Sequence, residues 1–139
     1  MKGQEVAGGK DAEPDIGVIP PAPSTDELAI LISEAPPYDA DGQDFYPNGI
    51  AGKVSGVDNP ERFSIVLYAK VDKWYVQPFV TSPYTKINSD GTWRNSTHSG
   101  MIYAALLVTK SFKPPATTFS LPGIGGNVVA IKEVAGKSR

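Results

Sequence analysis

The chain has 139 residues, of which 14 are glycine and 13 are proline, about a fifth of the total. It has no cysteine, which excludes disulfides, thiolate nucleophiles and cysteine-ligated zinc. The net charge of −2 hides an asymmetry: residues 1–48 carry ten acidic side chains and two lysines, a net −8, whereas the rest carries eleven basic and five acidic side chains, a net +6.

This length suits one domain with a buried core and a tail. The basic side chains of the second part stand singly along the sequence, so no concentrated phosphate-binding face, and hence no nucleic-acid partner, is expected. No run approaches the roughly 20 apolar residues of a membrane-spanning helix.

Residues 1–24 are rich in glycine, proline and charge, and they read as a flexible acidic arm before a domain at residues 25–139. The arm lacks the apolar centre of a signal peptide. Either the protein is cytoplasmic, or its leader is absent from this sequence. We expect the second, an extracellular or secreted protein.

After the arm, residues 28–32 favour a buried strand over a short helix, and Pro36-Pro37 ends it. The next segment, YDADGQDFYPNG, places Asp39, Asp41 and Asp44 around Gly42. Clustered carboxylates on a glycine turn suit calcium, although Ile50 stands where an EF-hand needs a glutamate. A calcium site at these three residues and a merely solvated acidic loop are the two interpretations.

From residue 49 onwards, short apolar runs alternate with turn residues, the pattern of an antiparallel β-sandwich. We expect a core over residues 49–134 with seven or eight strands and no long helix. The expected strands are residues 49–56, 62–71, 73–79, 92–95, 101–110 and 127–134. Residues 62–71 and 73–79 should form a hairpin, residues 101–110 should be central and buried on both faces, and residues 113–126 should be a crossover.

Five aromatic residues lie within twenty positions of one another in this core, and they either close the core or form a platform for an apolar ligand face such as a sugar ring. Strand alternation places Trp74, Val76 and Pro78 on one face and Tyr75, Gln77 and Phe79 on the other. The candidate ligand-binding residues are Trp74, Tyr75, Tyr84 and Trp93.

Four segments carry a resemblance: GKVSGVDNPERFSIVLYAKVD, WYVQP at residues 74–78, NSDGTW at residues 88–93 and YAALLV at residues 103–108. In their spacing they resemble a β-sandwich module found beside the catalytic domains of bacterial polysaccharide-degrading and other extracellular proteins. The resemblance implies an immunoglobulin-like, non-catalytic domain that contacts carbohydrate or acts as a spacer.

The sequence contains few candidate catalytic residues. His98 is the only histidine, no GxSxG elbow surrounds a serine, and three of the body's five acidic residues fall in expected tight turns. We therefore expect a binding module for a polysaccharide or other glycan, not an enzyme. The alternative is a self-assembling structural subunit, a homo-oligomer joined through residues 1–35, in which residues 28–33 add a strand to a neighbouring copy.

Overall fold

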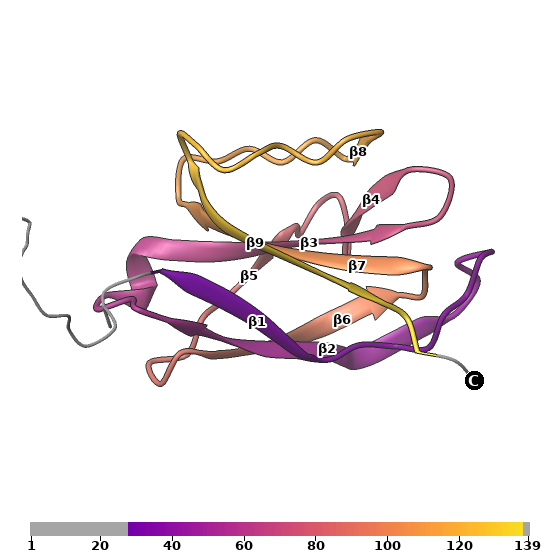
Figure 1. Cartoon of the computed structure of the whole chain (residues 1–139), viewed down its shortest axis with the longest axis horizontal. Coiled ribbons are helices and arrows are strands. Elements are labelled where there is room, and N and C mark those ends of the chain that lie inside the picture. Colours follow the sequence, from indigo (N-terminus) through magenta and orange to yellow (C-terminus); the bar gives the residue numbers. More distant parts are fainter. Residues whose placement is uncertain (1–27, 138–139) are drawn as a thin grey trace, which may run out of the picture.

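The computed structural model describes residues 28–137, which form two antiparallel sheets packed face to face (Figure 1). This confirms the predicted all-β antiparallel sandwich. One sheet has three strands in the order β1-β2-β6, and the other has six, in the order β8-β4-β3-β7-β9 with β5 also paired to β3. The predicted acidic arm, residues 1–24, lies outside the described residues.

The nine strands described are short, apart from β2. Their bounds are β1 (Ala29–Glu34), β2 (Phe45–Ser55), β3 (Phe63–Lys70), β4 (Trp74–Gln77), β5 (Tyr84–Thr85), β6 (Thr92–His98), β7 (Ile102–Thr109), β8 (Thr117–Thr118) and β9 (Val128–Ala135), with a 3-10 turn η2 (Pro60–Arg62) before β3. No helix within residues 28–137 is long and apolar enough to cross a membrane.

The core between the two sheets comes from alternate residues of the strands that face each other. Ile50 and Trp93 from the three-stranded sheet pack against Leu67, Tyr103 and Leu107 from the six-stranded sheet, and all five are buried. β7 lies between β3 and β9, and its residues 103–108 are all buried. The prediction that this segment is central and buried on both faces is therefore confirmed.

A second apolar cluster lies on the outer face of the six-stranded sheet. The segment at residues 110–127, which we call the strap, crosses this face and contains β8 (Figure 1). Phe112 and Leu121 of the strap pack on a cluster that includes Tyr68, Trp74 and Leu106. The strap is also fastened by a hydrogen bond in which the Tyr68 hydroxyl donates to the carbonyl of Pro115 at 2.7 Å. The six-stranded sheet is thus buried on both faces.

The burial of Tyr68 predicts a loss of stability in alkali. Burial raises the pKa of Tyr68 to about 12 from its ordinary value of 10.0. The unfolded chain therefore releases this proton at lower pH than the folded chain, so the stability is intact below pH 10 and falls as the pH rises toward 12. Urea unfolding across this pH range should show the loss of stability, and a Tyr68→Phe variant should show a smaller loss. An equal fall in both would contradict the assignment to Tyr68.

The described strands depart from the predicted ones mainly at β2 and β6. β2 begins at Phe45 instead of residue 49, and β6 continues to His98 instead of ending at residue 95. The two extensions pair with each other, Phe45 opposite His98, across an irregularity between Tyr46 and Ile50. Pro47 and Gly49 look like turn residues in the sequence, but here they lie in a strand that bulges and continues.

The residues predicted as a strand donor, 28–33, fall largely on β1. This strand pairs with β2 of the same chain, with Ile30 opposite Val54 and Leu31 opposite Lys53. Ile30 is also part of the core between the sheets. Donation of this strand to another copy would first require these contacts to break, and strand addition stays a prediction.

Candidate functional site

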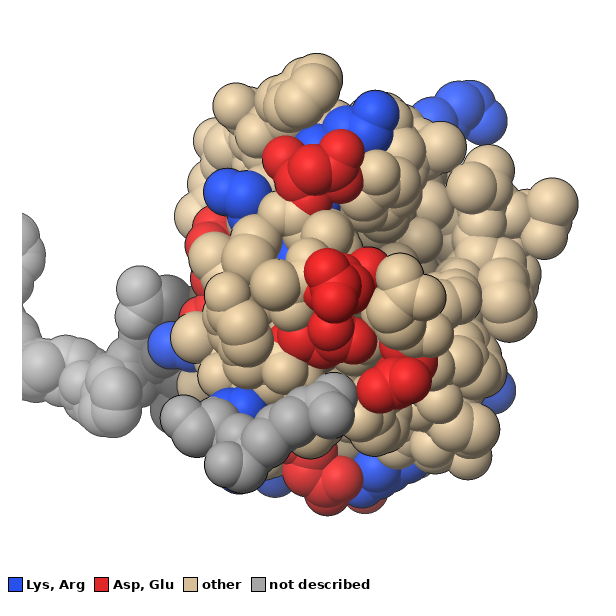
Figure 2. All heavy atoms as spheres, turned by 90° about the vertical axis from the view of Figure 1, so that its right-hand side faces the viewer, with Lys and Arg blue, Asp and Glu red and all other residues tan. Residues whose placement is uncertain are grey.

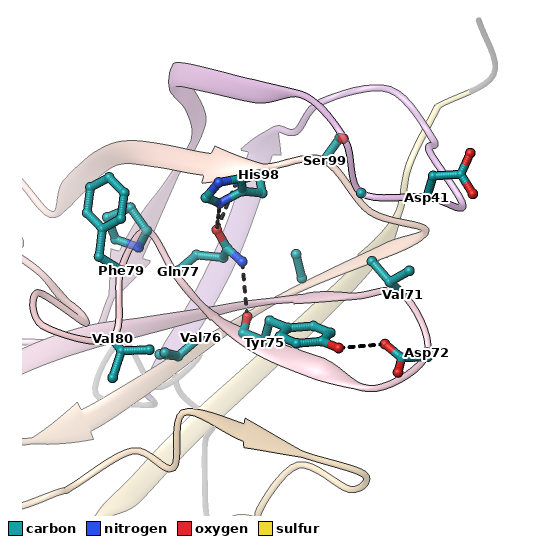
Figure 3. Close-up of a pocket in the computed structure, with 13 residues that line it drawn as sticks. Asp41, Val71, Asp72, Tyr75, Val76, Gln77, Phe79, Val80, His98 and Ser99 are labelled. Atoms are coloured by element: carbon teal, nitrogen blue, oxygen red, sulfur yellow. Dashed lines mark hydrogen bonds between the residues drawn. The ribbon is translucent and has the colours of Figure 1, made fainter.

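A pocket of about 540 Å³ opens on the side of the sandwich where β4 of one sheet and β6 of the other lie across from each other. Its volume falls within the roughly 300–1,000 Å³ of small-molecule sites. In Figure 3, Phe79 and Val80 lie at one end, Asp41 and Asp72 at the other, and Gln77 between them. The lining comes from four segments: residues 41–42, residues 69–72 except Lys70, residues 75–80, and residues 98–99.

Gln77 joins the two sheets at the floor of the pocket. Its side chain is 4% exposed, and its Oε1 accepts a hydrogen bond from the His98 backbone N–H at 2.9 Å. The same oxygen lies 3.0 Å from Nδ1 of the His98 ring, while Nε2 of Gln77 donates to the Tyr75 carbonyl at 3.3 Å (Figure 3). A backbone amide can only donate, so the atom facing it is the carboxamide oxygen, and Nδ1 of His98 must carry a proton. In this tautomer Nε2 is left as the hydrogen-bond acceptor of the ring.

Tyr75 and Asp72 form the wall nearest the β3–β4 turn. The Tyr75 hydroxyl donates to Asp72 Oδ1 at 2.8 Å. This bond lowers the pKa of Asp72, because it stabilises the carboxylate, and it raises the pKa of Tyr75, because the phenol is needed as the donor. Asp72 thus stays ionised at neutral pH and can accept further hydrogen bonds.

Three rings gather at the opposite end of the pocket. Phe45 and Phe79 stack with centroids 5.8 Å apart, and the His98 ring meets Phe45 edge to face at 4.9 Å. Phe45 and Phe79 are 41% and 50% exposed, so each presents part of its ring to solvent. Such a partly exposed ring face suits an apolar ligand surface.

The pocket carries negative charge. Asp41 and Asp72 line it, and no lysine or arginine within residues 28–137 does so. Figure 2 looks at the sandwich from the right-hand side of Figure 1 and shows acidic side chains grouped near the middle of that face. An anionic ligand would therefore be repelled, whereas hydroxyl groups and cations would find acceptors.

Two of the four predicted ligand-binding residues do not reach the surface. Trp74 is 5% exposed and lies under the strap, and Trp93 is 1% exposed and lies between the sheets. Neither ring offers a face to a ligand, so these two assignments are corrected: the rings close the core. Tyr84 is exposed, but it lies away from the pocket, with its hydroxyl donating to the Phe112 carbonyl of the strap at 2.6 Å. Of the four, the structure brings only Tyr75 into the pocket.

The predicted calcium loop is organised by hydrogen bonds of its own. Asp39 accepts from the backbone N–H groups of Asp41 at 3.0 Å and Gln43 at 3.1 Å, and from the hydroxyl of Ser99 at 2.7 Å. Among the described residues, no three histidine, aspartate or glutamate side chains form a group that could hold a metal ion. The Asp39 carboxylate shapes the loop through these bonds, and the calcium assignment to Asp39, Asp41 and Asp44 stays a prediction.

The structure adds three lining residues that sequence reasoning did not select as binding residues, Gln77, Phe79 and His98, and it packs Phe45 on two of them. A signal was present for two of them, since alternation from Tyr75 places Gln77 and Phe79 on the same face. Phe45 and His98 meet only through the β2–β6 register. Nothing in the sequence near either residue predicts that pairing.

No protein-family model matches this chain, and no curated protein or solved structure matches it either.

Proposed function

We propose that this chain is a non-catalytic module that binds a glycan of neutral sugar units in the pocket between β4 and β6. The observation that carries the proposal is the combination of exposed ring faces at one end of the pocket with an ionised carboxylate at the other. A sugar has the matching surface, with C–H groups on its faces and hydroxyl groups around its edge.

Each end of the pocket has a defined part in this binding. Phe79 offers its ring to the C–H face of a sugar. Asp72, held by Tyr75, accepts hydrogen bonds from sugar hydroxyls, and Nε2 of the His98 ring is a further acceptor. The two carboxylates favour neutral or amine-bearing sugars over uronates and sulfated sugars, because each would repel a second negative charge.

The hydrogen bonds of Ser99 and His98 support a role for these two side chains in positioning the groups around the pocket, in preference to a catalytic role. The Ser99 hydroxyl donates to Asp39 and accepts from the backbone N–H of Asp44 at 3.1 Å, and the His98 Nδ1 faces an amide oxygen. In a serine nucleophile the hydroxyl would instead donate to the imidazole, and a carboxylate would orient that ring. An extracellular setting, where such modules meet polysaccharides, is part of the proposal.

Affinity electrophoresis on gels containing soluble β-glucans and mannans tests the proposal. We expect at least one neutral polymer to retard the chain and a polyuronate to leave it unretarded. Phe79→Ala should remove the retardation, since the ring supplies the stacking surface. Tyr84→Ala is the matched control, because it deletes another exposed ring outside the pocket, and it should run like the parent chain.

Retardation that is abolished by Tyr84→Ala but kept in Phe79→Ala would place the site elsewhere. The absence of retardation in every neutral polymer would reject a glycan as the ligand.

A further inference from the structure

Phe119, outside the pocket, is the most exposed large hydrophobic residue described, at 78%. It follows β8 on the strap, and its position is fixed by the backbone. β8 pairs with β4, Thr117 opposite Tyr75 and Thr118 opposite Trp74. The next turn is closed by the Thr118 hydroxyl, which donates to the Ser120 carbonyl at 2.7 Å and accepts from the Ser120 N–H at 3.3 Å. This hydrogen-bonded turn thus holds the apolar Phe119 ring in solvent.

The Phe119 ring lies close to the Tyr75 side of the pocket, because the two rings share Lys73 as a neighbour. Residues opposite each other in a ladder share a face, and alternate residues of a strand share a face. Thr117, opposite Tyr75, is therefore on the face of Tyr75, and Phe119 follows the end of β8 in the next turn. Lys73 links the two rings, because its Nζ lies 5.8 Å from the Tyr75 ring centre and 5.5 Å from the Phe119 ring centre.

These contacts place Phe119 just beyond the Tyr75 wall. Since the two ring centres lie 5.8 and 5.5 Å from the same nitrogen, they are at most 11.3 Å apart. Phe119 does not line the pocket itself, so a ligand confined to the pocket does not contact it. A ligand that extends out of the pocket over Tyr75 does contact Phe119.

We propose that Phe119 is a second stacking subsite and that the ligand is an extended glycan chain, with one part in the pocket and a neighbouring sugar unit on the Phe119 ring. The proposal rests on the proposed function and adds to it the length of the ligand. Lys73, between the two rings, donates hydrogen bonds to hydroxyl oxygens of the unit that spans them. The exposed rings of Phe119 and Phe79 then belong to one binding track with the pocket between them.

The test compares short and long ligands. Isothermal titration with the disaccharide and the hexasaccharide of β-1,4-glucan and β-1,4-mannan is carried out on the full chain and on Phe119→Ala. Loss of one stacking contact should weaken hexasaccharide binding about tenfold and leave disaccharide binding unchanged. Ile124→Ala, which removes another exposed apolar side chain from the strap, is the matched control and should change neither affinity.

Unchanged hexasaccharide affinity in Phe119→Ala would overturn the second subsite. Equal weakening of both ligands would also overturn it, because Phe119 would then act on the pocket itself. In either case a loss of binding in Phe79→Ala would leave the proposed function standing. If neither oligosaccharide nor any neutral polymer binds the parent chain, the proposed function fails and this inference fails with it.

Discussion

A Gly52→Ala variant is expected to lose about 3 kcal/mol of unfolding free energy, the upper end of the usual cost of overpacking. Gly52 lies in the central strand of the three-stranded sheet, opposite Trp93. A Cβ at this position would lie 2.5 Å from Cζ2 and 2.8 Å from Cε2 of the Trp93 ring, and closer still to the Leu31 carbonyl oxygen of β1. The Leu31 carbonyl belongs to a paired strand and the Trp93 ring is buried in the core, so neither can move without breaking contacts.

Urea unfolding followed by tryptophan fluorescence measures this loss. Gly123→Ala is the matched control, since no atom lies within 4 Å of its added Cβ, and its stability should stay within about 0.5 kcal/mol of the parent. If Gly52→Ala unfolded at the same urea concentration as the control, the packing of the Trp93 ring over β2 would be wrong.

A Gln77→Met variant is expected to lose both stability and ligand binding. Methionine fills a similar volume, but it leaves the His98 backbone N–H without its acceptor and the His98 ring without its support. An unsatisfied buried donor costs about 1–3 kcal/mol. Glycan affinity should fall about tenfold, because the ring that offers Nε2 is no longer oriented.

The measurements are urea unfolding and titration with the glycan that retards the parent chain. Gln43→Met is the matched control, since Gln43 is exposed and its Nε2 makes only a 3.4 Å contact with the Asp41 carbonyl. A double variant with His98→Ala should lose less than the sum of the two single variants, because both remove the bond between His98 Nδ1 and Gln77 Oε1. Additive losses would show that Gln77 does not act through His98.

The sequence predicts the fold class well because the strands that build the core carry strong local patterns. β3 alternates between the inner and outer clusters, and β7 is apolar throughout, so their burial could be inferred from periodicity alone. The two-residue strands β5 and β8 could not be predicted, since each is fixed by a partner strand and has no pattern of its own.

The site was predicted less well because burial depends on segments far apart in the chain. Trp74 would be a surface ring on a bare sheet, but the strap covers that face and takes it into the second cluster. Trp93 fits between the sheets because Gly52 stands opposite it, forty-one positions earlier. The exposed rings among the described residues are consequently those of phenylalanines and tyrosines, and not the tryptophans.

An NMR titration with the neutral glycan that retards the chain tests most directly whether the pocket between β4 and β6 is the binding site. We expect the largest shifts at the Gln77 side-chain amide and at the backbone amides of Phe79 and His98, with the indole N–H signals of Trp74 and Trp93 unmoved. Shifts confined to the two indoles and Tyr84, with a silent pocket, would contradict the account.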